Sequence, residues 1–244
     1  MSFQTRVASK TCMIVGRPMW RYPIALPKPP PATAPLIEAI RQIDCRPFRV
    51  ISHAAEDGKV FNASFFHDEK TMHDFGEWYA ENALAPGSEH HQCLRDAVAE
   101  DTELPTRSDL LFGSGAQVLT DSRFGEYQLG MAVRYSRYSL RSGDAAVEAE
   151  SNACEPAFEQ RIARAMLDAG VTYFGRLVMR APSAKPASGA SNGAGEWVSA
   201  SRYGSIDDAR RGTAVVKAMF APEIGRWFSD TESIIGTASR VLEL

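Results

Sequence analysis

The pattern of hydrophobic and polar positions predicts the same order of elements in each half of the chain. In the first half, apolar residues three and four apart predict a helix around Leu36 and Ile40 and a second around Met72 and Phe75. Alternating positions with β-branched or aromatic residues predict strands. These strands are residues 9–17, PFRVISHAA, KVFNASFFH and GAQVLTDS. The predicted order is therefore βαββαβ.

Turn and capping residues set the limits of these elements. Asp57-Gly58 between two strand-like runs predicts a tight hairpin turn. Thr33 and Asp68 precede the two helices in the N-cap position. Half of the prolines lie between residues 18 and 35, which indicates an extended, semi-rigid connection. A short helix is expected at 90–99, within the polar connection that leads to the last strand.

The second half repeats this order. A long strand is predicted over 126–140, and Asn152 with Glu155 resembles a capping box at the start of a helix. Two further strands follow, separated by a small, polar, glycine-rich excursion. The two strands and the excursion are VTYFGRLVMRA, GEWVSASRYG and residues 182–195.

The last helix of the second half begins at a cap formed by Ser205 with Asp208. Pro222 and Gly225 are expected to break this helix, and TASRVLEL is the closing strand. Trp227 is expected to cover one end of the sheet.

The halves align with each other. The shift that places Gly58 on Gly195 also places Ser64 on Ser201 and the cap Asp68 on Ser205. A βαββαβ unit is the ferredoxin-like arrangement, with two helices on one face of an antiparallel sheet. The other face is also apolar, and packing two such sheets face to face would bury it.

At this point the chain resembles the dimeric α+β barrel superfamily, and in particular its members with both units in one polypeptide. The resemblance is carried by GKVFNASFFHDEKTMHDFGEWYAE in the first half and by GEWVSASRYGSIDDARRG and GTASRVLEL in the second. It implies an α+β fold in which tandem ferredoxin-like βαββαβ units, residues 1–123 and 124–244, form an intrachain α+β barrel. The superfamily includes cofactor-independent antibiotic-biosynthesis monooxygenases, polyketide cyclases, haem enzymes and ligand-sensing domains.

Candidate site residues lie on the predicted strands, because alternate residues of a barrel strand point into the cavity. The candidates for catalysis are the following residues: His53, His67, Arg134, Arg176 and Arg202. The candidates for substrate binding are aromatic: Tyr135, Tyr138, Tyr173, Trp197 and Tyr203. A neutral imidazole could remove an acidic proton, and an inward guanidinium could stabilise the oxyanion. Each of these residues could instead be structural.

Composition and motif content argue against several classes of function. A net charge of −3 and a pI near 6.0 give no electrostatic footprint for nucleic acid. No apolar run is long enough to span a membrane or to form a signal peptide, so a cytoplasmic protein is expected. The four cysteines lie far apart in sequence, and no metal-ligand or nucleotide-binding motif is present.

Three functions remain open. The first is cofactor-independent oxygenation or cyclisation of an acidic aromatic or polyketide-like substrate in the barrel cavity. The second is a haem-binding barrel enzyme with His53, His67 or His73 as axial ligand. The third is a noncatalytic ligand-binding or scaffold module whose pocket is filled by side chains such as Phe66. A small molecule is the expected partner, and the tandem chain could also form a homodimer.

Overall fold

The computed structural model describes residues 6–15, 31–56, 60–98, 104, 110–119, 128–140, 145–180 and 196–244. The chain divides into two compact units. The first unit comprises Lys10–Ser114 with Gly236–Leu244, and the second comprises Met1–Ser9 with Gly115–Ile235. The predicted turn at Asp57-Gly58, the excursion at 182–195 and most of the proline-rich connection lie outside the described residues.

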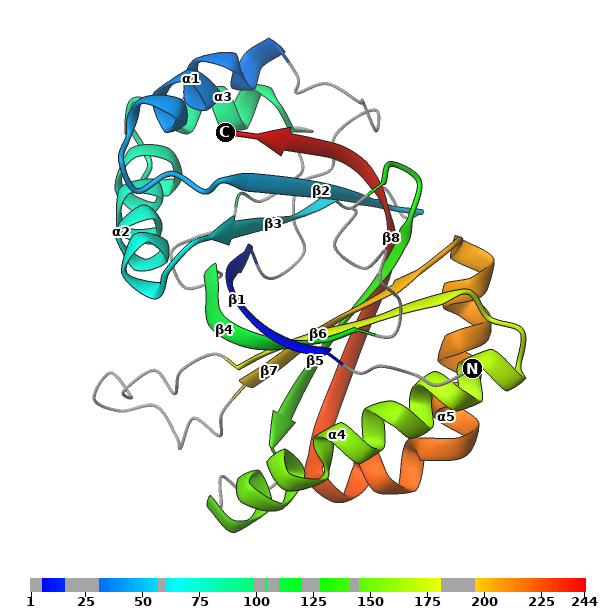
Figure 1. Cartoon of the computed structure of the whole chain (residues 1–244). Coiled ribbons are helices and arrows are strands. Elements are labelled where there is room, and N and C mark those ends of the chain that lie inside the picture. Colours follow the sequence, from blue (N-terminus) through cyan, green and yellow to red (C-terminus); the bar gives the residue numbers. More distant parts are fainter. Residues whose placement is uncertain are drawn as a thin grey trace. The chain divides into compact units, whose positions relative to one another are not determined.

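The sheet of the first unit is antiparallel, with neighbouring strands in the order β1-β3-β2-β8 (Figure 1). Its strands are the C-terminal part of β1 (Arg6–Val15), β2 (Arg49–Ala55), β3 (Val60–Phe66) and the C-terminal part of β8 (Phe228–Glu243). Its helical elements are η1 (Pro31–Thr33), α1 (Ala34–Gln42), α2 (Glu69–Tyr79), the π-helical η2 (Ala80–Leu84) and α3 (His91–Asp96). Phe66 of β3 packs on Phe75 of α2, which joins this sheet to its helices.

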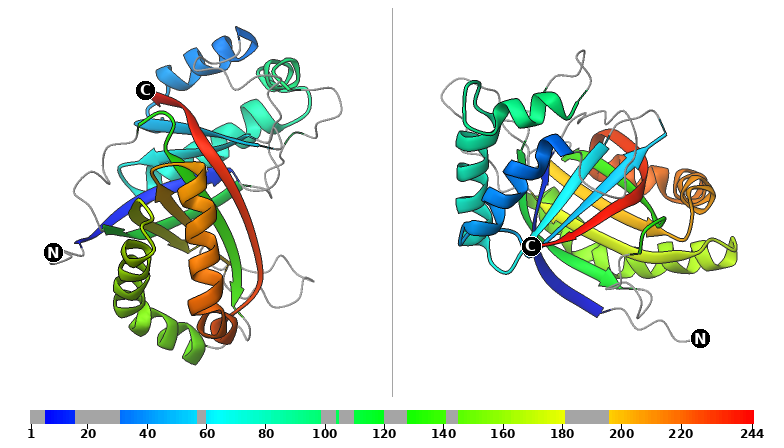
Figure 2. Two further views of the ribbon diagram at one scale, coloured as in Figure 1. Left: turned by 90° about the vertical axis from the view of Figure 1, so that its right-hand side faces the viewer. Right: turned by 90° about the horizontal axis from the view of Figure 1, so that it is seen from above.

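The second unit contains an antiparallel sheet in the order β8-β5-β7-β6-β4. Its further elements are the C-terminal part of β4 (Leu110–Leu119), β5 (Ala132–Leu140), α4 (Ala145–Asp168), β6 (Tyr173–Arg180), β7 (Glu196–Tyr203) and α5 (Ile206–Trp227). Helices α4 and α5 lie side by side (Figure 2) and pack against β5, β6 and β7. Strands β1, β4 and β8 each contribute residues to both units.

The core of the second unit lies between its sheet and the two long helices. Tyr203 of β7 and Met166 of α4 are almost fully buried in it. At one end, the ring of Phe158 makes edge contacts with the rings of Phe220 and Trp227. Trp227 is therefore a core residue of the second unit, packed against α4.

Two of the predicted caps are confirmed. Asp68 accepts a hydrogen bond from the backbone of Thr71, and Ser205 accepts one from the backbone of Asp208. Thr33 occupies the N-cap position of α1, but its side chain makes no capping hydrogen bond. The aligned caps of the two halves thus start α2 and α5 in the same way.

Two helix limits were predicted wrongly. α4 begins at Ala145, so Asn152 lies inside the helix instead of capping it, because residues 145–151 are mostly alanine and glutamate, which favour helix. α5 continues through Pro222 and Gly225 to Trp227. A proline inside a helix removes one backbone hydrogen bond, but burial of Phe220 and Trp227 on either side of it offsets this loss.

Strand limits differ from prediction as well. β5 starts at Ala132, because residues 129–130 form a turn and Gly130 has a φ of 88°. β8 begins at Phe228, well before the predicted TASRVLEL segment, and directly follows α5. The short helix predicted at 90–99 is α3.

The architecture is a mixture of helices and curled antiparallel sheet, which is consistent with an α+β barrel fold. Within the described ranges, no helix combines the length and the apolar character needed to cross a membrane.

Candidate functional site

Strand register sorts the predicted site residues of the second unit onto two faces of its sheet. Ala132 belongs to the core beneath α4 and α5, so alternation places Arg134 and Tyr138 of β5 on the same helix-covered face. Ser201 of β7 is paired with Arg134 on one side and with Arg176 of β6 on the other. The two arginines therefore belong to one row across three adjacent strands.

This row is part of a polar layer between the sheet and the helices, which we call the helix-facing layer. Its members are Arg134, Ser136, Tyr138, Tyr173, Arg176, Ser199, Ser201 and Tyr203 of the sheet, with Glu159 of α4 and Ser233 of β8. Five of the predicted site residues thus lie together in this layer: Arg134, Tyr138, Tyr173, Arg176 and Tyr203. They lie under the helices, not on the face expected to line a barrel interior.

The remaining predicted residues of this unit lie elsewhere. Tyr135 and Arg202 are buried on the opposite face of the sheet, because each alternates with a member of the helix-facing layer. The backbone of Trp197 pairs with Tyr138, but its side chain lies outside the described residues.

Arg176 forms a buried ion pair with Glu159. The side chain of Arg176 is 14% exposed and that of Glu159 is 1% exposed. Such burial is tolerated because the two charges compensate each other. Nothing in the sequence pattern marked Glu159 as a site residue, because its ion pair with Arg176 joins two elements that only the fold brings together.

Arg134 has a different environment. It is 7% exposed, donates a hydrogen bond to the Ser233 hydroxyl at 3.2 Å, and lies beside the Tyr203 hydroxyl. Ser233 is also 2.9 Å from the Ser136 hydroxyl. Among the described residues no carboxylate pairs with Arg134, and its buried Nε has no hydrogen-bond partner. The guanidinium of Arg134 thus lies among neutral hydroxyls, and its Nε–H can still donate a hydrogen bond to a ligand.

Two phenols of the layer, Tyr173 and Tyr203, are held in their neutral form. Burial raises the pKa of Tyr173 well above its usual value, and the carboxylate of Glu159 adds to this effect. Burial also raises the pKa of Tyr203, although the charge of Arg134 opposes the shift. At neutral pH both phenols therefore act as hydrogen-bond donors, not as bases.

All five histidines of the chain belong to the first unit. His53 is 0% exposed and lies on β2, on the face opposite to that of Ser52. His67 is exposed and stacks on Phe48, with 4.5 Å between ring centroids. His73 is exposed on α2, 3.7 Å from Glu69.

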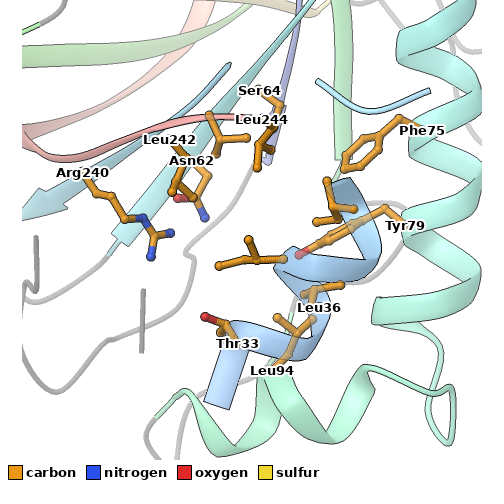
Figure 3. A pocket seen from close by; sticks show the side chains of 13 residues that line it. Thr33, Leu36, Asn62, Ser64, Phe75, Tyr79, Leu94, Arg240, Leu242 and Leu244 are labelled. Carbon is orange, nitrogen blue, oxygen red and sulfur yellow. The ribbon is translucent and has the colours of Figure 1, made fainter. Parts of the chain in front are cut away.

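The first unit contains a cavity of about 80 Å³ between its sheet and its helices (Figure 3). We call it the first-unit cavity. Helices α1, α2 and α3 contribute apolar residues to its wall, including Leu36 and Phe75. Asn62 of β3 and Arg240 of β8 provide polar groups at one end.

Neither the first-unit cavity nor the helix-facing layer contains one of the histidines expected as an axial haem ligand. His53, His67 and His73 are not among the residues that line the first-unit cavity, whose volume is far below the ~300–1,000 Å³ of ordinary ligand sites. The helix-facing layer belongs to a unit without histidine. Over the described ranges, no group of three His, Cys, Asp or Glu side chains could hold a metal ion.

Solved structures resemble the chain over nearly its whole length. A variant chlorite dismutase from Candidatus Nitrospira defluvii, in complex with cyanide, has a TM-score of 0.50 and 11% identity, over 96% of this chain and 91% of that chain. A proposed monooxygenase from Lactobacillus acidophilus NCFM has a TM-score of 0.46 and 8% identity, over 96% of each chain. An anthrone oxidase-like protein has a TM-score of 0.46 and 8% identity, over 96% of this chain and 92% of that chain.

No protein-family model matches the chain, and no curated protein matches its sequence. At these low identities the structural likeness concerns the fold alone. The fold is consistent with an α+β barrel.

Proposed function

We propose that the chain is a tandem-unit α+β barrel enzyme that binds an acidic aromatic or polyketide-like molecule and oxygenates or cyclises it without a cofactor. The observation that carries this proposal is the environment of Arg134, a buried guanidinium among hydroxyls with no carboxylate beside it in the described part of its unit. A buried cation in such surroundings favours a ligand that brings a negative charge.

The chemistry of the helix-facing layer suits a phenolate or enolate. Arg134 supplies fixed positive charge, and the neutral hydroxyl of Tyr203 supplies a hydrogen-bond donor beside it. Donors fixed in a site of low polarity stabilise an oxyanion more strongly than water does. Arg176 is neutralised by Glu159, and we therefore assign the anion to Arg134.

In the proposed oxygenation, a CH₂ carbon flanked by carbonyl or aryl groups loses a proton, and the carbanion reduces O₂. One oxygen atom enters as C=O, and the other leaves as water with the two hydrogens of the CH₂ group. In the proposed cyclisation, the same carbanion attacks an internal carbonyl carbon. The helix-facing layer holds no histidine, so we propose that the acidic proton leaves to water; His53 and His67, the expected bases, belong to the other unit and are given no part in this step.

Oxygen consumption with dithranol, an acidic anthrone, tests this function. The protein should accelerate oxygen uptake above the rate in buffer, with one O₂ used per carbonyl formed. Arg134→Gln should lower kcat/KM by about 10²- to 10³-fold. Arg164→Gln is the matched control, since Arg164 is an exposed arginine of the same unit, and it should behave as wild type. Equal rates for wild type and Arg134→Gln would refute the proposal, and a Soret band in the purified protein would favour the haem alternative.

A noncatalytic binding module is the second candidate, and the packing of two residues favours it. Phe66 is 3% exposed and Tyr203 is 1% exposed, so both rings fill core positions. This candidate predicts that dithranol binds without any acceleration of oxygen uptake. Light scattering would test whether the chain forms the proposed homodimer.

A further inference from the structure

We propose that the first-unit cavity is a second binding site, specific for a short-chain monocarboxylate whose carboxylate is held by Arg240 and Asn62. No residue of this cavity belongs to the helix-facing layer. The proposal is therefore independent of the proposed oxygenation or cyclisation.

The polar end of the cavity is built by strand register. Ser52 of β2 is paired with Asn62 on β3 and with Arg240 on β8. Asn62 and Arg240 thus flank the same residue on the same face, roughly 10 Å apart at the backbone. Each is 8% exposed, so water competes little for their side chains.

Both groups present hydrogen-bond donors. The carbonyl oxygen of the Asn62 side chain accepts a hydrogen bond from the Ser52 hydroxyl at 2.6 Å, which leaves the Nδ2 amide as a donor. The Arg240 guanidinium carries five N–H donors, so it can bind a ligand oxygen while keeping other partners. A guanidinium beside an amide N–H favours a carboxylate, which has two acceptor oxygens.

The rest of the cavity sets the size and polarity of the ligand. Arg240 is the one lining residue whose side chain is charged at neutral pH, and a ligand with a single carboxylate carries one complementary charge. Figure 3 shows Leu36, Leu94 and Phe75 on the side away from Arg240, together with Thr33 and Tyr79; we propose that the apolar side chains contact the tail of the ligand. A volume of about 80 Å³ holds roughly five to eight water-sized atoms. Butyrate and valerate have this size and polarity.

Calorimetric titration of the full chain with valerate and with its neutral analogue pentanamide tests the site. Wild type should bind valerate about 10- to 100-fold more tightly than pentanamide, because the carboxylate forms charge-assisted hydrogen bonds. Arg240→Gln should abolish this preference. Arg41→Gln, an exposed arginine on α1, is the control and should keep it.

A variant that keeps Arg240 tests the cavity separately. Ile37→Phe places a larger side chain in the wall of the cavity and should weaken valerate and pentanamide alike. If circular dichroism shows that Arg240→Gln is unfolded, Arg240→Lys replaces it and should reduce the preference for valerate.

Three results would overturn the proposal: no saturable binding of valerate to wild type, equal affinities of wild type for valerate and pentanamide, or a preference unchanged in Arg240→Gln. Arg134→Gln should leave valerate binding intact. A failure of this second site can thus be told apart from a failure of the proposed oxygenation or cyclisation.

Discussion

Gly212 of α5 lies against the ring of Tyr203 so closely that a Cβ atom at position 212 would stand 2.6 Å from Cε1 of that ring. The same Cβ would be 3.2 Å from the sulfur of Met166 on α4. The absence of a side chain at this position therefore sets the distance between α5 and the sheet. It also positions the Tyr203 hydroxyl beside Arg134.

Gly212→Ala should destabilise the protein. The ring of Tyr203 is 1% exposed and cannot move aside, so overpacking should cost about 1–3 kcal/mol. This cost exceeds the gain of up to ~1 kcal/mol from replacing glycine by alanine in a helix. Urea denaturation measures the difference.

Gly225→Ala is the matched control for this prediction. A Cβ at position 225 would meet no atom within 4 Å, and the residue lies in the same helix. The variant should gain up to ~1 kcal/mol of helix propensity. Equal effects of the two substitutions would contradict the close packing of α5 on Tyr203.

Glu159→Gln should destabilise the protein because it leaves the charge of Arg176 buried without its partner. Breaking a buried ion pair in this way costs about 3–5 kcal/mol. The double variant Glu159→Met with Arg176→Met should recover most of the stability, since an apolar pair can replace a buried ion pair. Urea denaturation of Glu159→Met, Arg176→Met and the double variant gives the coupling energy as a double-mutant cycle, and additive effects would show that the two side chains do not interact.

The raised pKa values of Tyr173 and Tyr203 predict a loss of stability in alkali. An unfolded tyrosine loses its proton near pH 10.0, whereas these two buried phenols keep theirs to higher pH. The folded state then binds more protons than the unfolded state, so stability is complete below pH 10 and falls as the pH rises above it. Urea midpoints measured from pH 8 to 11 should show this decline, and it should flatten in Tyr173→Phe. A decline of the same size in the variant would argue against this cause.

Pro222→Ala should stabilise α5. Pro222 lies inside the helix, is exposed, and cannot donate a backbone hydrogen bond. A proline in a helix interior costs about 3 kcal/mol relative to alanine, and the variant should recover up to about this amount. Thermal unfolding followed by circular dichroism would show the gain as a higher Tm, and an unchanged or lower Tm would mean that the proline ring itself supports the packing of this turn.

Much of the order of elements could be predicted from hydrophobic periodicity, because periods of two and 3.6 are local properties of the chain. Helix starts were less predictable. Asp68 and Ser205 cap their helices as expected, but Asn152 does not, since alanine and glutamate before it extend the helix. Local capping preference is weaker than the propensity of several consecutive helix formers.

The composition of the candidate site was partly predictable. The period of two along a strand puts Arg134 and Tyr138 on the same face, but it does not show which face of the sheet the helices cover. That follows from tertiary contacts, such as those of Ala132 with the core beneath α4 and α5. Ser233 was missed because its contact with Arg134 joins residues far apart in sequence.

The most direct test of the central claim is an anaerobic fluorescence titration of the protein with dithranol, because it isolates binding of the anion from any reaction with oxygen. Wild type should bind it, and Arg134→Gln should bind about 10- to 100-fold more weakly while Arg164→Gln is unchanged. Equal dissociation constants for wild type and Arg134→Gln would contradict the assignment of the anion to Arg134.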